Sequence, residues 1–189
     1  MNSFPIREID LGDQTKRIAA LSLLNETLGD KLYNEQTLLK VTEKETLLVA
    51  AYDEEEMVGI AMAGKLDQTG VDFYTPFGPE AVVRLKGNTI GVLRNSGVKS
   101  NYRGRGIGTA LLAERLRWLK QTGCDYAIGV TWMHGQTTQS DQLFRSAGMK
   151  QLGPTVPEFY KSISQKTGLV CPYCGFPCLC PGALFIKKL

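Results

Sequence analysis

The chain has 189 residues, a formal net charge of +3 and 43% hydrophobic residues, which is ordinary for one globular domain with a small appendage. No apolar run is long enough to span a bilayer, and the first thirty residues mix acidic with basic side chains instead of resembling a signal peptide. We therefore expect a cytoplasmic protein with no membrane partner.

The composition of the chain changes near residue 165. Residues 161–189 contain four lysines and no acidic residue, and four of the five cysteines lie within 171–180. Four lysines are too sparse for an arm that binds nucleic acid, so a nucleic acid partner is not expected. The sequence predicts a main domain over residues 1–165 and a cysteine-rich tail over residues 166–189.

The chain begins with the pattern of a strand followed by two helices. Residues 6–9 alternate as a strand does, and apolar residues at helical spacing then predict a helix with Asp13 as its N-cap and Gly29 as its stop. A second, short helix is expected over residues 35–43.

The middle of the chain predicts antiparallel strands. Two runs rich in β-forming residues flank the acidic turn at 53–56, which is the pattern of a hairpin. Residues 67–88 contain several glycines and prolines and predict a long surface loop, and residues 89–98 predict the next strand.

The rest of the main domain alternates between helix and strand. A helix is expected over 107–123, a strand over 126–133 and a short helix over 139–148. The final strands are expected over 149–152 and 158–163. A strand, a helix and a strand in succession predict parallel neighbours, while the hairpin predicts antiparallel ones. The fold class is therefore α/β, with a central mixed sheet and helices on both faces.

The stretch NYRGRGIGTALL, residues 101–112, places three glycines at alternate positions directly before an apolar helix. A strand that enters a helix through such a turn exposes the first N–H groups of the helix at the positive end of its dipole. This arrangement attracts anions, and phosphates above all. Glycine also lets the ligand approach the backbone and permits a positive φ.

The spacing of this turn separates three kinds of phosphate-binding motif. A P-loop needs a lysine followed by serine or threonine, and no lysine occurs between Lys99 and Lys120. A dinucleotide fingerprint needs G-x-G-x-x-G, which the glycines do not match. The acyl-coenzyme A turn, [Q/R]-x-x-G-x-[G/A], fits fully through Arg103, Gly106 and Gly108.

Through this turn and the later QLFRSAGM, which looks like the signature L-Y-x-K-x-G-F, the chain resembles the GNAT superfamily of N-acetyltransferases. The order of elements matches from about residue 4 to residue 163. The resemblance implies the GNAT-like acyl-CoA N-acyltransferase fold, acetyl-CoA as the cosubstrate and an unidentified amine as the acceptor. A homodimer is one assembly compatible with it.

The resemblance also implies where acetyl-CoA lies. In the family, the strand before the turn carries a bulge and splays from the next parallel strand, and the pantetheine arm pairs with it in the opening. The Val98 N–H is then expected to point at the thioester carbonyl, and the turn to hold the pyrophosphate. The cofactor-binding residues implied are Ser96, Val98, Lys99, Arg103, Gly104, Arg105, Gly106, Ile107, Gly108, Thr109 and Phe144.

The acid and base of the reaction are not where the family commonly places them. Phe144 stands at the position of the acidic tyrosine, and Val92 at that of a glutamate. His134, the only histidine, is a candidate base, with a loop residue without a catalytic role as the alternative. Tyr160 is a candidate acid, with simple packing as the alternative. With Val98, these two are the predicted catalytic residues.

The tail sequence CPYCGFPCLC places four thiols in ten residues, at Cys171, Cys174, Cys178 and Cys180. In a cytosolic protein a CPxCG turn presents two thiolates to a metal, and two more complete a tetrahedral zinc site. Zinc ribbons usually bring their second pair from further along the chain. Redox-active or simply reduced thiols, and an iron–sulfur site, are therefore kept as alternatives.

The leading hypothesis is an acetyl-CoA-dependent N-acetyltransferase that moves an acetyl group to a primary amine by direct attack on the thioester. The alternative is a coenzyme A-binding sensor or adaptor with weak or no catalysis, whose tail binds a partner. A third hypothesis makes the tail a zinc module that recognises protein or nucleic acid. Release of free thiol from acetyl-CoA separates the first two.

Overall fold

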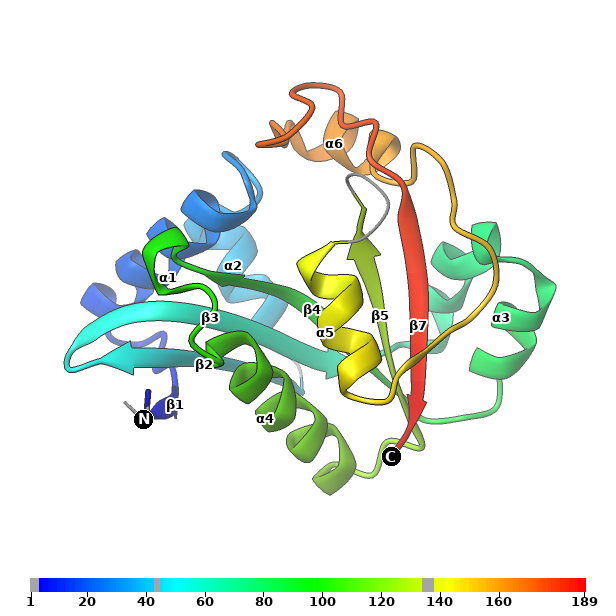
Figure 1. The fold of residues 1–189 in the computed structure, drawn as a ribbon, viewed down its shortest axis with the longest axis horizontal. Helices are drawn as coiled ribbons and strands as arrows, with labels where there is room; N and C mark the ends of the chain where they lie inside the picture. Colours follow the sequence, from blue (N-terminus) through cyan, green and yellow to red (C-terminus); the bar gives the residue numbers. More distant parts are fainter. Residues whose placement is uncertain (1–3, 43–44, 134–137) are drawn as a thin grey trace.

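The computed structural model describes residues 4–42, 45–133 and 138–189. Its centre is a single sheet in which one neighbouring pair of strands is parallel and the others are antiparallel (Figure 1). The strands are β1 (Ile6–Glu8), β2 (Thr46–Asp53), β3 (Glu56–Lys65), β4 (Ile90–Val98), β5 (Tyr126–Trp132), β6 (Lys150–Gln151) and β7 (Gly182–Lys188). Their order across the sheet is β1-β2-β3-β4-β5-β7-β6, and β4 and β5 are the parallel pair.

Helices cover both faces of this sheet, as the sequence predicts (Figure 1). One face carries α4 (Ile107–Gln121) and α5 (Gln139–Ser146), whose apolar residues pack with those of β2, β3 and β5. The other face carries α1 (Gln14–Leu28) and α2 (Glu35–Thr42), which pack on β2 and β3. The mixed α/β sheet with helices on both faces is thus confirmed.

Local signals in the sequence explain where the first long helix begins and ends. Asp13 has extended backbone angles and its side chain accepts hydrogen bonds from the N–H groups of Thr15 and Lys16, at 2.9 and 3.2 Å. Gly29 ends the helix with φ +110°. The predicted N-cap and stop are both confirmed, because each depends on one side chain and not on distant packing.

The prediction of a long surface loop over residues 67–88 is wrong. The segment forms the 3-10 helix η1 (Gln68–Phe77) and α3 (Pro79–Leu85), which pack behind β4, β5 and β7. Val71, Tyr74 and Phe77 are buried there, and Phe77 has no exposed surface. Burial of such a side chain contributes about 2 to 3 kcal/mol, which outweighs the local turn preferences of glycine and proline.

The prediction of a strand over residues 158–163 is also wrong. Residues 161–167 form α6 (Lys161–Thr167), and the expected place in the sheet is taken by β7. The seven residues of β7 all pair with β5, and β6 pairs with its other edge. Residues 182–188, which the sequence groups with the cysteine-rich tail, are therefore a strand of the main sheet.

Within the described part of the chain, none of the helices combines the length and the apolar character that crossing a bilayer requires.

Candidate functional site

The two parallel strands at the middle of the sheet separate over most of their length. β4 and β5 pair through only three residue positions, from Ile90 opposite Tyr126 to Val92 opposite Ile128. β4 then continues to Val98 and β5 to Trp132 without pairing with one another. A gap between two sheet edges therefore opens at the carboxyl ends of both strands, where ligands of α/β proteins commonly bind.

A β-bulge turns the end of β4 away from β5. Leu93 lies opposite Ala63 and Ser96 lies opposite Ala61, so that Arg94 and Asn95 both face Met62. The extra residue bends β4 at the point where its pairing with β5 has ended. Both the bulge and the separation of the strands agree with what the family resemblance implies.

The peptide groups of Val98 point into this gap. The Lys99 N–H donates to Val58 O of β3 at 3.0 Å. Because neighbouring residues of a strand direct their peptide groups to opposite sides, the Val98 N–H and C=O point away from β3. The Val98 oxygen accepts a hydrogen bond from Arg103 Nε at 3.1 Å.

The opposite side of the gap presents the peptide groups of Val130. Val130 lies opposite Leu184 of β7, but the Leu184 oxygen accepts from the Leu152 N–H on the side of β6. Val130 therefore directs its peptide groups away from β7 and toward the gap. Its oxygen is 3.4 Å from the Tyr160 hydroxyl, which donates to it. The hydroxyl of Tyr160 thus lies at the β5 edge of the gap.

The glycine turn leads from β4 into an uncapped helix. Gly104 and Gly106 have φ values of +75° and +84°, in the left-handed region, and a Cβ at either position would meet no atom within 4 Å. The α4 ladder begins with the Ala110 N–H, which donates to Gly106 O at 3.0 Å. No side chain among the described residues caps the helix. The N–H groups of Ile107, Gly108 and Thr109 are thus available for an anion.

The long side chains around this turn bind other parts of the protein. Arg103 donates to Val98 O, and the guanidinium carbon of Arg105 lies 4.9 Å from the centre of the Tyr102 ring. Lys99 Nζ lies 2.5 Å from Glu56 Oε1, and this contact lowers the pKa of Glu56. The backbone N–H groups are therefore the groups of the turn best placed to hold a phosphate.

A hydrogen bond to the hairpin of β2 and β3 also stabilises the turn. The Tyr102 hydroxyl donates to Asp53 Oδ2 at 2.9 Å, and this bond is the main reason why the pKa of Tyr102 is raised to about 12. Tyr102 is therefore a neutral donor at physiological pH. The acidic turn between β2 and β3 thus holds the loop that precedes α4.

The remaining residues that the sequence singles out lie in different surroundings. Ser96 is partly buried on β4, just after the bulge. Phe144 is buried in the core, where its ring lies against Gly129 of β5 and 5.8 Å from the ring of Phe185. His134 lies outside the described residues. The structure thus brings Ser96, Val98 and Tyr160 to the gap, and Phe144 to the face of β5 beneath α5.

Tyr160 is held in an apolar environment. Its ring lies 5.5 Å from that of Trp132, and both rings pack against the buried cysteines of the tail. Burial raises the pKa of its hydroxyl far above the ordinary value, so the group stays protonated.

Two contacts at the bulge were not predicted from the sequence. Arg115 of α4 has 1% of its surface exposed and donates from Nη1 to Arg94 O at 3.3 Å. The Tyr33 hydroxyl, in the loop between α1 and α2, donates to Asn95 Oδ1 at 2.8 Å. A signal for Arg115 exists, since it continues the buried series Ile107, Leu111 and Leu119 at steps of four residues.

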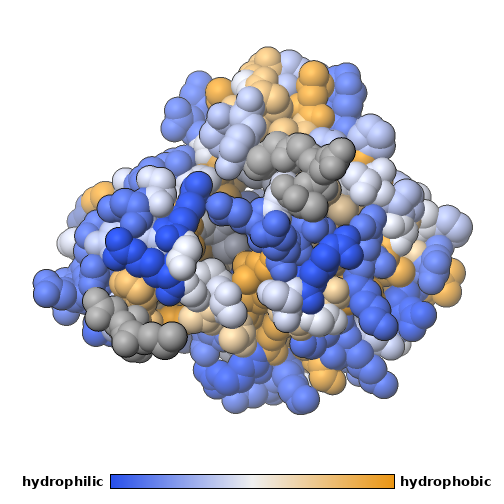
Figure 2. All heavy atoms as spheres, in the orientation of Figure 1, coloured by the Kyte–Doolittle hydropathy of each residue, from blue (hydrophilic) through white to orange (hydrophobic). Residues whose placement is uncertain are grey.

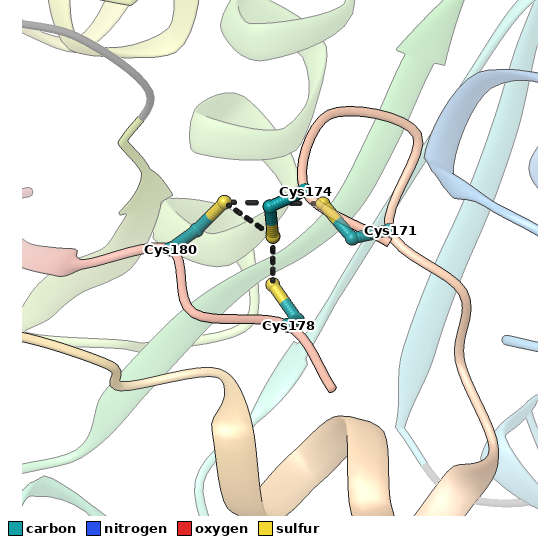
Figure 3. A group of neighbouring side chains, drawn as sticks. All are labelled: Cys171, Cys174, Cys178 and Cys180. Atoms are coloured by element: carbon teal, nitrogen blue, oxygen red, sulfur yellow. Dashed lines mark hydrogen bonds between the residues drawn. The ribbon is translucent and has the colours of Figure 1, made fainter. Parts of the chain in front are cut away.

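The four tail cysteines converge on one point (Figure 3). Their sulfur atoms all lie within 4.8 Å of one another. Cys171, Cys178 and Cys180 are buried, and Cys174 is exposed. The sequence prediction that these four residues could hold a metal is thus compatible with their positions, and the identity of an ion stays a prediction.

An apolar groove lies between α4 and α5, in the middle of the face seen in Figure 2. Its volume is about 250 Å³, and it begins at Thr109 beside the uncapped end of α4. The groove is lined by Thr109, Leu112, Ala113, Leu116, Leu143, Ser146, Ala147 and Lys187.

Comparison with known proteins connects these features. The family model described as "Acetyltransferase (GNAT) family" matches residues 15–149. No curated protein matches the chain in sequence.

Solved structures share the whole fold at low identity. NAA60 from Arabidopsis thaliana, solved with acetyl-CoA, has a TM-score of 0.73 and 15% identity, covering 99% of both chains. The ribosomal-protein-S18-alanine N-acetyltransferase from Escherichia coli has a TM-score of 0.66 and 14% identity, covering 97% of this chain and 92% of that one. Polyamine N-acetyltransferase from Drosophila melanogaster has a TM-score of 0.67 and 15% identity, covering 98% and 100%.

Proposed function

The chain belongs to the acetyltransferase (GNAT) family, and from this premise we propose that it transfers an acetyl group from acetyl-CoA to a primary amine by direct attack on the thioester. The observation that carries the proposal is the gap between β4 and β5, with the Val98 N–H on one side and an uncapped helix at its end. The gap offers backbone partners to an extended arm, and the helix offers them to a diphosphate.

The proposed position of the cofactor follows from these groups. The diphosphate accepts hydrogen bonds from the backbone between Arg103 and Thr109, where the two positive-φ glycines let it approach. The pantetheine arm extends along Ser96 and Val98. The adenosine end lies toward the apolar groove that begins at Thr109. Phe144, on α5, contributes through the packing of its ring on β5 and not as a proton donor.

In the proposed reaction, the amine attacks the thioester carbonyl while the Val98 N–H donates to the oxygen that becomes negative. One such donor is worth about 3 kcal/mol of barrier, and holding both reactants in register about 7 to 11 kcal/mol. The C–S bond then breaks and the thiolate takes a proton. Positioning supplies the larger share, so the family architecture works with few acid–base groups.

Tyr160 is the proposed donor of that proton. Its hydroxyl lies at the β5 edge of the gap, and its raised pKa keeps it protonated, so that it can donate to the sulfur as the C–S bond breaks. His134 keeps its predicted role as the base that receives the proton of the ammonium substrate. Tyr160→Phe is expected to lower kcat while coenzyme A binding stays unchanged.

A primary amine is the proposed acceptor because the chemistry requires a nucleophilic nitrogen. The names of two of the similar structures, an alanine N-acetyltransferase and a polyamine N-acetyltransferase, point to the same class of acceptor for those proteins. At identities of 14 and 15% they do not select one amine for this chain.

One observation favours the second candidate, a coenzyme A-binding sensor or adaptor. The ring of Phe144 lies directly on Gly129, just past the point where the strands separate, and it has no proton to give. Such a protein binds the cofactor but transfers no acetyl group.

The experiment is the release of free thiol from acetyl-CoA with amino acids, polyamines and short peptides as acceptors, together with calorimetric titration of coenzyme A. Thiol release matched by an equal amount of acetylated amine supports the transferase. Tight binding without turnover on any acceptor supports the sensor or adaptor. A folded protein that binds no coenzyme A overturns both.

A further inference from the structure

The proposed reaction leaves the cysteine-rich segment without a task. We propose that Cys171, Cys174, Cys178 and Cys180 bind one zinc ion, and that this site fastens the connection between β6 and β7 across the open end of the sheet. The site holds this connection against the loop between α1 and α2.

The sulfur positions are those of a single four-coordinate centre. A tetrahedral ion with metal–sulfur bonds of about 2.3 Å places its sulfurs about 3.8 Å apart. Cys174 Sγ lies 3.7 Å from Cys178 Sγ and 3.5 Å from Cys180 Sγ, and the latter lies 3.8 Å from Cys171 Sγ (Figure 3). Because one sulfur neighbours several others, the group forms one centre and not two separate pairs. Because all four sulfurs lie within 4.8 Å of one another, the space between them fits a single ion.

The backbone around the first two cysteines is shaped to present their sulfurs. Cys171 and Gly175 exchange two backbone hydrogen bonds, of 3.1 and 3.0 Å, and Gly175 turns the chain with φ +75°. The Tyr173 N–H donates to Cys171 Sγ at 3.4 Å, and the Leu179 N–H donates to Cys174 Sγ at 3.3 Å. Such donors stabilise thiolates, the form in which cysteine binds metal.

The second pair of cysteines connects the site to the sheet. The Cys178 N–H donates to the Ser164 hydroxyl of α6 at 2.9 Å, and Ser164 is fully buried. Cys180 is followed by Pro181 and then by β7, and the Met133 N–H donates to Pro181 O at 3.0 Å. The three buried cysteines pack on Trp132 and Tyr160. An ion here therefore joins α6, the end of β5 and the start of β7.

The segment also contacts the opposite half of the sheet. The Val170 N–H donates to Asp30 O at 3.4 Å. Gly29 lies so close that a Cβ on it would be 2.5 Å from Val170 O. Gly29 and Asp30 follow α1, which packs on β3 and β4, whereas the cysteines precede β7. The segment thus runs from one half of the sheet to the other, above α5 and β5 in Figure 1.

Zinc is the ion that this donor set favours. Four thiolates with three of the four residues buried form a closed, soft site with no position for a substrate, which is the pattern of structural zinc. A short cysteine-rich segment has little apolar packing of its own, and bonds to the ion would stabilise its fold instead.

The first experiment measures metal in the full chain purified under reducing conditions. We expect one zinc ion and no iron per chain, and loss of zinc in Cys174→Ser and in Cys178→Ser. Cys124→Ser, in the turn after α4, is the matched control and keeps its zinc. Cobalt exchanged into the wild type is expected to show thiolate charge-transfer bands and the d–d bands of a tetrahedral site.

Three results would overturn the zinc site. The first is iron in place of zinc, and the second is that reduced, metal-free wild type takes up no zinc in competition with a chromophoric chelator. The third is that fewer than the five free thiols of the chain are found after denaturation with chelator and without reductant. The competition and thiol assays use the wild type, so they decide the question even if the serine variants fail to fold.

The second experiment tests the fastening by hydrogen exchange with and without zinc. Removal of the ion is expected to speed exchange in residues 169–182 and also in 29–33, with β2 and β3 unchanged. Gly29→Ala should keep its zinc yet speed exchange in 29–33, whereas Gly123→Ala, which also has a positive φ but open space, should not. Changes confined to 169–182 would overturn the fastening. Neither experiment uses enzyme activity, so both stand apart from the proposed function.

Discussion

The guanidinium of Arg115 donates a hydrogen bond to the carbonyl oxygen of Arg94, so a buried cation of α4 holds the bulged residues of β4. A second bond, from Arg115 Nε to Leu111 O at 3.3 Å, fixes the side chain along its own helix. Burial lowers the pKa of Arg115 to about 10, which still leaves it charged at neutral pH. Among the described residues, no carboxylate forms an ion pair with it.

Arg115→Met is expected to affect cofactor binding more than stability. The substitution removes the cost of burying a charge, which offsets much of the stability lost with the hydrogen bonds of Arg115. The free energy of unfolding should therefore change by less than about 2 kcal/mol. The bulge loses its support, and coenzyme A affinity should fall roughly tenfold, which is about 1.4 kcal/mol. Urea denaturation and calorimetry measure the two effects. The exposed Arg117→Met is the control, and equal affinities in both variants would contradict this role of Arg115.

Gly106→Ala is expected to weaken coenzyme A binding at least tenfold. A Cβ disfavours the left-handed backbone by about 1 to 2 kcal/mol, and relaxation of the turn moves the N–H groups that we propose hold the diphosphate. Gly123→Ala carries the same backbone strain at the far end of α4, also in open space. Both variants should lose similar stability, and only Gly106→Ala should lose affinity. Equal affinities by calorimetry would show that the turn does not hold the ligand.

Val98→Pro is expected to lower kcat by roughly 10² to 10³, because proline removes the N–H that we propose donates to the developing oxyanion. That N–H points away from β3, so the substitution removes no hydrogen bond of the sheet. Val98→Ala keeps the N–H and is the matched control. Steady-state kinetics with saturating acetyl-CoA compare the two. Similar kcat values would remove Val98 from the mechanism.

The buried tyrosines predict a loss of stability at alkaline pH. Burial raises the pKa of Tyr74 to about 12 in the folded protein, whereas the unfolded chain ionises near 10. The unfolded state therefore loses its proton first, and the free energy of unfolding falls as pH rises from about 10 to 12. The full contribution is about 3 kcal/mol and is present below pH 10. In denaturant titrations across this range, Tyr74→Phe should show a shallower decline; an unchanged slope would contradict the assignment.

Features set by a few neighbouring residues could be predicted from the sequence. The N-cap Asp13, the hairpin turn and the glycines before α4 each depend on local backbone chemistry, and all three are present. The bulge and the gap between β4 and β5 followed from the resemblance carried by that same turn.

Features set by distant packing could not be predicted. Residues 67–88 contain turn-forming glycine and proline, but Tyr74 and Phe77 fold inward because the back of the sheet needs an apolar cover. Residues 158–163 have the local pattern of a strand, and nothing in that pattern shows that β7 takes the place beside β5. β7 pairs with β5 along its whole length, so Phe159 and Tyr160 lie beside the sheet instead of forming one of its strands. The contact of Arg115 was not predicted because its acceptor, Arg94 O, belongs to the bulge of a distant strand.

The short pairing between β4 and β5 makes the sheet two wings joined along a narrow seam of three residue positions. The neighbouring pairs β3–β4 and β5–β7 are joined at six and seven positions, so twisting of one wing against the other meets the least resistance at the seam. An extended ligand bound in the gap as proposed would form hydrogen bonds to both edges, as an additional strand does. Binding of the cofactor at this place would therefore stiffen the sheet as a whole.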